Sequence, residues 1–231
     1  MGFDLNAVLM GVVQLLVFWL ALSVRESARA WMAAGLGDPG LREAGRISLN
    51  PARHVDAVGS GLLPLLLLLL RAPLFGWAKP APVAWQSLGE RNRSPIWVSL
   101  AGPVANLLTA AAAIAALAVA LRLIGPEARD AALLALLQQY DRAALLDGFP
   151  LVFTLEQIAL TSSFLAAFQL LPVPPQDGGT ILLELLPTEW ALRYARISPY
   201  GRLIAMSLAI FKVVGLMILP VSIVLVLVIN L

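Results

Sequence analysis

Arg25 and Arg29 flank Glu26 at a spacing that other proteins use for metal chemistry. Residues four apart lie on one face of a helix, and His residues at this spacing around a Glu bind zinc while the Glu acts as the general base. Residues 25–29 read Arg-Glu-Ser-Ala-Arg, so both ligand positions hold Arg. A guanidinium offers only donors and keeps its proton in proteins, so it does not coordinate zinc. The spacing therefore indicates a zinc-binding helix whose two ligands are replaced.

The elements that must position these side chains are long apolar segments. Only 13% of the residues are charged, against roughly 25% in soluble domains, and the mean hydropathy is +0.85. Four stretches each exceed the ~18 apolar residues that mark a membrane span. They are residues 5–24, 94–121, 151–175 with only Glu156 charged, and 203–231 with only Lys212 charged. The sequence predicts an all-α integral membrane protein with about four transmembrane helices, in a single domain of residues 1–231.

A shorter apolar run, residues 58–70, contains Pro64 and is short for a crossing, so we expect a re-entrant or interfacial segment. If it does not cross, residues 35–57, 71–95 and 174–202 share one membrane face. That face then carries ten of the basic residues, and the opposite face carries three. Basic residues concentrate on the cytoplasmic side of membrane proteins. We therefore expect a multi-pass protein of the bacterial cytoplasmic membrane, with the loop around Asp177 on the cytoplasmic side.

Composition excludes some other functions. The chain has no Cys, so it forms neither disulfides nor thiolate metal sites. Its net charge is only +2, and most of the excess is Arg that flanks membrane segments, so no nucleic-acid partner is expected. Residues 44–57 and 73–86 are punctuated by Pro and Gly and contain short β-compatible pieces, at 46–49 and 83–85. They predict a small β element at the membrane interface.

Five motifs, in this order along the chain, identify a family. They are residues 25–29, residues 45–51 with His54 and Asp56, residues 75–80, residues 101–103 with Asn106, and residues 171–179. The chain resembles the site-2 protease family of intramembrane zinc metalloproteases, in its short form without a PDZ or CBS domain. The motifs span residues 20–185, which is most of the chain.

The resemblance implies roles for individual residues. In that family two His and one Asp bind zinc and the Glu activates water, so Glu26 matches the base and Asp177 the third ligand. Arg25 and Arg29 match the two His. The only His of this chain, His54, lies in a loop motif and cannot rebuild a two-His site.

Three polar positions surround this centre by analogy with the family. Gln169 stands where the family usually has Asn, and Asn106 and His54 match other family motifs. Lys212, inside the last apolar run, pairs with an acid such as Glu184 or Asp177, or else extends to the headgroups.

An internal ion pair is expected at the altered centre. Arg25, Arg29, Glu26 and Asp177 have no net charge together, so the guanidinium of Arg25 or Arg29 can fill the place of zinc and pair with Asp177. The alternative is that both Arg side chains extend to the headgroups.

The function expected from these residues is non-catalytic. We expect a pseudoprotease that sits in the lipid bilayer, carries no cofactor and binds or scaffolds a transmembrane protein or peptide. One alternative is an active zinc metalloprotease, which would need zinc. The other is a structural subunit of a larger membrane complex.

Overall fold

The computed structural model of the chain describes residues 5–70, 72, 74–79, 83–84, 94–139, 143, 148–211 and 213–230. Within these ranges it is helical and contains no strand, which confirms the all-α class. The α-helices are α1 Leu5–Leu36, α2 Gly40–Glu43, α3 Leu63–Leu69, α4 Ser94–Ile124, α5 Pro126–Leu136, α7 Phe149–Gln169, α8 Asp177–Leu185, α9 Thr188–Ala195, α10 Ser198–Ile210, α11 Val213–Met217 and α12 Leu219–Asn230. A 3₁₀ turn at Pro51–Arg53 and a π-helical segment at Ala57–Leu62 precede α3.

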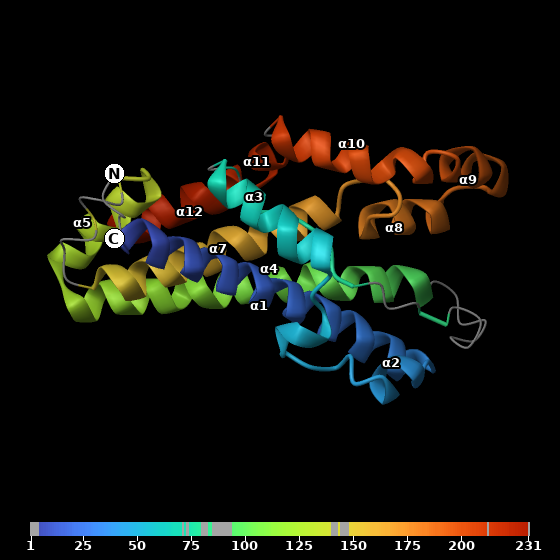
Figure 1. Cartoon of the computed structure of the whole chain (residues 1–231), viewed down its shortest axis with the longest axis horizontal. Coiled ribbons are helices and arrows are strands. Elements are labelled where there is room, and N and C mark those ends of the chain that lie inside the picture. The colour runs from blue at the N-terminus through green and yellow to red at the C-terminus, as the bar shows by residue number, and fades with distance from the viewer. Residues whose placement is uncertain are drawn as a thin grey trace.

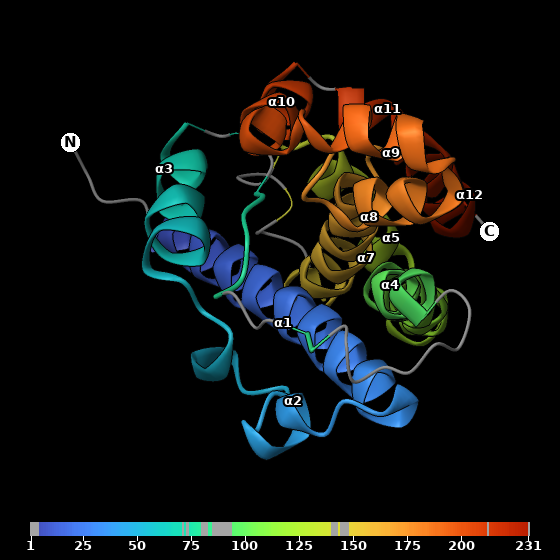
Figure 2. The same ribbon diagram turned by 90° about the vertical axis from the view of Figure 1, so that its right-hand side faces the viewer.

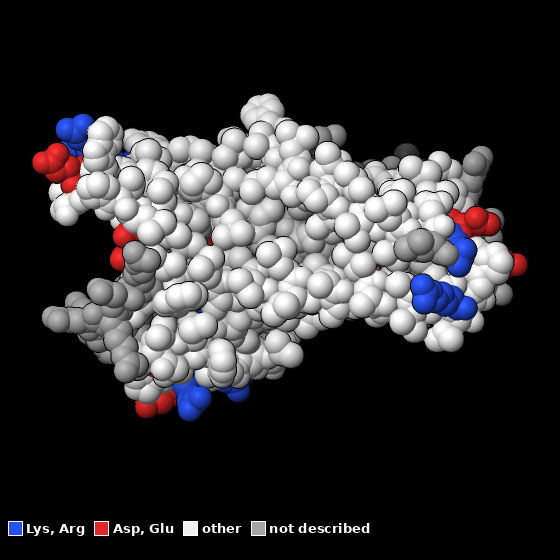
Figure 3. All heavy atoms as spheres, turned by 180° about the vertical axis from the view of Figure 1, so that it is seen from behind, with Lys and Arg blue, Asp and Glu red and all other residues white. Residues whose placement is uncertain are grey.

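Three helices are long and apolar enough to cross a membrane, namely Asn6–Leu36 in α1, Ser94–Ile124 in α4 and Phe149–Gln169 in α7. In Figure 1 they run along the length of the molecule, with α4 antiparallel to α1 and α7. Charged side chains gather at the two ends, and the band between them is uncharged on the face in Figure 3. Such a band is what the hydrocarbon layer of a bilayer requires.

The core lies where α7 meets its neighbours. Val152 and Ala159 of α7 pack with Leu117 of α4 and Leu225 of α12. Nearer the opposite end of α7, Phe164 and Phe168 join a second cluster with residues of α3 and α10. Figure 2 shows this arrangement end-on, with α10–α12 over α7 and with α3 beside α1. Because α7 packs against other helices on several sides, its C-terminal end holds the loop that follows it in position.

The last apolar run does not form one long helix in the described residues. It is divided into α10, α11 and α12, of which the longest has 13 residues. In Figure 1 the three helices nevertheless run back along the bundle, from the end that holds α9 to the end that holds the N-terminus. The expected count of about four spans is not confirmed, since three helices have the length. Lys212, which falls between α10 and α11, lies outside the described residues.

The segment expected to be re-entrant forms the short helix Ala57–Leu69, and the chain then returns beside its start (Figure 1). The amide of Lys79 donates to the carbonyl of His54 at 2.7 Å, and that of Trp77 to Gly59 at 3.3 Å. A missing Cβ makes this close approach possible, because a Cβ on Gly76 would lie 1.9 Å from the carbonyl oxygen of Gly59. The start of the short helix and the residues that return after it therefore lie side by side, at one level along the molecule.

The expected β element is not confirmed. The described residues hold one isolated antiparallel bridge, between Val55 and Ala78, and part of the second expected piece lies outside them. The backbone of the first piece is used by side chains instead. The Ser27 hydroxyl donates to the carbonyl of Ser48 at 2.5 Å and accepts from its amide at 3.0 Å. Because the amide and the carbonyl of Ser48 both bond to Ser27, this stretch is held against α1 and does not pair with a neighbouring strand among the described residues.

Candidate functional site

α1 carries three of the four charged residues of the centre. It continues without a break through Arg25, Glu26 and Arg29 and ends at Leu36. Arg25 comes nineteen residues after Asn6, or about 28 Å at 1.5 Å per residue. The hydrocarbon layer is roughly 30 Å thick, so a span that starts near Asn6 brings these side chains to the opposite edge of the layer.

Asp177 is the first residue of α8 and is buried. The preceding segment folds back onto the end of α7, so α8 starts in close contact with backbone. A Cβ on Gly178 would lie 2.2 Å from the carbonyl oxygen of Leu170, and one on Gly179 would lie 2.4 Å from the Pro174 nitrogen. Only glycine fits both places, which explains why two glycines follow Asp177.

The structure brings Arg25, Glu26, Arg29 and Asp177 together. The Arg25 guanidinium donates through Nη2 to Asp177 Oδ2 at 2.7 Å and through Nε to the same oxygen at 3.2 Å. Its Nη1 pairs with Glu26 Oε1. Arg29 lies farther off, with Nε 3.6 Å from Asp177 Oδ1 and Nη1 3.7 Å from Glu26 Oε1. Each carboxylate therefore lies between two guanidinium groups, and two positive charges face two negative ones.

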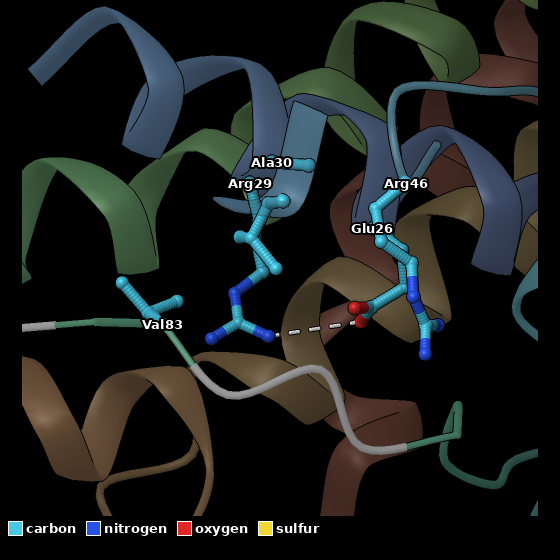
Figure 4. A pocket seen from close by; sticks show the side chains of 6 residues that line it. Glu26, Arg29, Ala30, Arg46 and Val83 are labelled. Carbon is cyan, nitrogen blue, oxygen red and sulfur yellow. Dashed lines mark ion pairs between the residues drawn. The ribbon is translucent and has the colours of Figure 1, made fainter. Parts of the chain in front are cut away.

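A small pocket of about 10 Å³ borders this cluster. Figure 4 shows the Arg29 guanidinium pointing toward the Glu26 carboxylate, with Val83 on the far side of Arg29. Arg46 also lines this pocket. Glu26 is only 6% exposed. Burying a charge is costly unless it is paired, and the neighbouring guanidiniums supply the opposite charges.

Gly102 of α4 gives the two arginines their room, and its role at this site was not predicted. A Cβ at Gly102 would lie 2.7 Å from Arg25 Cγ and 3.4 Å from Arg29 Cγ. In the sequence Gly102 stands out only as part of the motif of residues 101–103, a Gly-Pro pair inside an apolar run. The structure shows that Gly102 packs against the aliphatic stems of Arg25 and Arg29.

Of the polar positions expected around the centre, Gln169 lines a cavity together with Arg25, Glu26 and Arg29, and its Oε1 has no partner among the described residues. Asn106 is fully buried in α4, and its amide atoms also lack partners there. His54 bonds through Nε2 to the carbonyl of Ser48 at 2.7 Å. Neither Asn106 nor His54 is among the residues that line this cavity.

The donor set does not fit zinc. Structural zinc sites take four and catalytic zinc sites three protein ligands from Cys, His, Asp and Glu. No group of three or more such residues comes together in the part of the chain that the structure describes. Glu26 and Asp177 are present, but the two side chains between them are guanidiniums without a lone pair to donate. The centre therefore offers only two of the ligands that a zinc ion takes in proteins.

The larger cavity, of about 290 Å³, opens beside the cluster. Residues 75–79 form one wall and the end of α7 another, and Arg202 and Met206 of α10 complete it. The Arg202 guanidinium lies over the Trp77 ring, 5.6 Å from its centroid. The cavity therefore combines cationic side chains with apolar and aromatic surface.

Long apolar helices that enclose a buried cluster of charges define a helical membrane protein with a polar centre near one end of its spans. Over 193 residues, 82% of this chain and 76% of the relative, the chain is 31% identical to a protein of Bacillus subtilis (strain 168) named "Putative zinc metalloprotease YwhC". The chain belongs to the family of this relative, and the relative's name fits the site-2 protease family that the motifs indicate. No family model and no solved structure matches the chain.

Proposed function

We propose that this protein is a catalytically inactive member of the site-2 protease family that binds or scaffolds a transmembrane partner. The observation that carries the proposal is the contact between Arg25 and Asp177. Asp177 matches the third zinc ligand of the family, and here its Oδ2 accepts two hydrogen bonds from the Arg25 guanidinium. Asp177 therefore balances the charge of Arg25, which is a covalent part of the chain, and not the charge of a metal ion that could dissociate.

The total charge of the centre supports the replacement of zinc by two arginines. Zinc held by two neutral His brings two positive charges to this position, and Arg25 with Arg29 brings the same two. Glu26 and Asp177 therefore keep their electrostatic balance without a metal. Isolated ionised carboxylates are costly to bury, so this equality explains how both acids can remain buried after the His ligands are lost.

Elemental analysis of the detergent-purified protein tests the proposal. We expect zinc far below one atom per chain in the wild type, and the same in the Asp177→Ala variant. Changing Arg25→His and Arg29→His together should raise the zinc content. Changing Arg42→His and Arg122→His, which adds two His on exposed positions at opposite ends of the molecule, should not. About one zinc per wild-type chain, lost in Asp177→Ala, would overturn the proposal.

The name of the relative favours one competing function, an active intramembrane zinc metalloprotease. The same measurement separates the two, because that activity requires bound metal. A third possibility, a structural subunit of a larger complex, also lacks metal and differs in how firmly the partner is held. A partner that survives size-exclusion chromatography in stoichiometric amount would favour the subunit, and a partner recovered only after crosslinking would favour the scaffold.

The membrane placement is part of the proposal. We propose that α10–α12 together make a fourth crossing, and that the end with α2, α8 and α9 faces the cytoplasm of a bacterial cell. The excess of Arg and Lys in the segments at this end supports the orientation. The route of α10–α12 along the bundle supports the crossing (Figure 1).

A further inference from the structure

The cavity of about 290 Å³ has an excess of positive charge. Its lining includes Arg25, Arg29, Lys79 and Arg202, against the single carboxylate of Glu26. Asp177, which is bonded to Arg25 but is not itself a lining residue, brings the negative charges to two. Among the residues that the structure describes, two positive charges of the lining therefore have no carboxylate to balance them. In a partly desolvated cavity this excess favours a bound anion.

Arg29 is the cation best placed to bind an anion. Its two ion pairs, at 3.6 and 3.7 Å, are longer than hydrogen bonds, and it makes no hydrogen bond to any residue that the structure describes. Arg25, by contrast, has its donors directed at Asp177 and Glu26. Gln169 is 3% exposed and lines the same cavity with an amide oxygen that has no partner in the described part of the chain. A polar ligand in the cavity would meet groups that are not already used.

The remaining lining indicates what is attached to the anion. Phe75, Phe168 and Met206 form an apolar part of the wall, and the Trp77 ring lies under Arg202. Arg25 and Arg29 lie at the edge of the expected hydrocarbon layer, which is the depth of lipid phosphates. A free anion in water gains nothing from the apolar wall, and an acidic peptide would need polar partners for its backbone there. A phospholipid presents a phosphate and an acyl chain at this depth.

We propose that the cavity binds the phosphate of an anionic membrane phospholipid, with Arg29, Lys79 and Arg202 as the cationic contacts and the Phe75–Phe168 wall against its glycerol and upper acyl region. Basic pockets between transmembrane helices hold lipid headgroups in this way, and Arg binds phosphate oxygens in pairs. The proposal rests on the proposed function, because Arg29 can contact a lipid phosphate only if no metal ion is bound at this centre. The volume fits the lower end of ligand pockets, ~300 Å³, and thus one headgroup rather than a whole lipid.

The probe is phosphatidic acid, whose phosphate carries no further headgroup. Thermal unfolding of the full chain in detergent is followed while phosphatidic acid, phosphatidylcholine or inorganic phosphate is titrated in. The test variant is Lys79→Gln with Arg202→Gln, both exposed positions on the cavity. The matched control is Arg193→Gln with Arg196→Gln, two exposed positions on and after α9, outside the cavity lining. Both variants lose the same charge, and unfolding without lipid reports any change in folding.

We expect phosphatidic acid, but neither phosphatidylcholine nor inorganic phosphate, to raise the unfolding temperature of the wild type and of the control. The test variant should bind it about tenfold more weakly or worse, because it loses two charged contacts. Equal weakening in the control would show a general effect of surface charge and overturn the proposal. So would an equal shift with inorganic phosphate, or no shift with phosphatidic acid. Zinc content is measured on the same samples. If phosphatidic acid does not bind and the samples contain no zinc, the lipid proposal fails and the proposed function is unaffected.

Discussion

The ion pair between Arg25 and Asp177 should carry a large part of the stability of this end of the bundle. The Asp177 side chain is only 4% exposed and that of Arg25 12%. Removing one partner of a buried pair costs ~3–5 kcal/mol, because the other charge stays behind. Glu26 still contacts Arg25 in the Asp177→Ala variant, so we expect about 3 kcal/mol, the lower end of that range. Asp177→Asn should recover part of the loss, since it keeps an acceptor but not the charge.

Double-mutant cycles measured by equilibrium unfolding in detergent identify the partner. Arg25→Leu should restore more stability in the Asp177→Ala background than Arg29→Leu does, since Arg25 bonds Asp177 at 2.7 Å and Arg29 approaches only to 3.6 Å. Asp130→Ala, at an exposed position, serves as the control and should change stability by less than ~0.5 kcal/mol. If both cycles are additive within ~0.5 kcal/mol, neither arginine is coupled to Asp177 and the ion pair does not stabilise the fold. A coupling to Arg29 that exceeds the coupling to Arg25 would also contradict the assignment of Arg25 as the partner.

Two further predictions use other parts of the chain. Gly102→Ala should cost ~1–3 kcal/mol, as overpacking does, because its Cβ would lie 2.7 Å from Arg25 Cγ. Gly35→Ala, whose Cβ would have no neighbouring atom within 4 Å, should instead raise the free energy of unfolding by ~0.4–1 kcal/mol. Equal effects of the two substitutions in unfolding assays would contradict the packing argument. Single cysteines at Arg193 and Asp130, in a chain without native Cys, should react with impermeant reagents from opposite sides of the membrane. Labelling of both from one side would exclude the proposed orientation.

Three of the four expected membrane spans were predictable from hydrophobic length, but their ends were not. The apolar run of α1 stops at Val24, yet the helix continues to Leu36. Charges normally end a span, but here Arg25 and Glu26 are paired within the protein and need no water. The division of the last run into α10–α12 was missed, although the sequence carries a signal for it: Lys212 falls between α10 and α11, and Pro220 is the second residue of α12.

Sequence reasoning placed the charged residues of the centre but not their surroundings. The motif around Glu26 and the one around Asp177 each have a recognisable spacing, so their residues could be named in advance. Lys79 and Arg202 belong to segments far apart in the chain and reach the same cavity only through the return of residues 74–79 and the course of α10. Such a convergence depends on the packing of several elements, which no local pattern encodes.

On the proposed function, the guanidinium groups between Glu26 and Asp177 also make the stability of this protein independent of the metal supply of the cell. A fold that is held by a bound ion gains stability with the concentration of that ion, by mass action. Here the positive charges are covalent parts of α1, at Arg25 and Arg29. Chelators and zinc starvation should therefore leave the fold intact. On the proposed function, a cell that lacks zinc would keep this protein folded in the membrane.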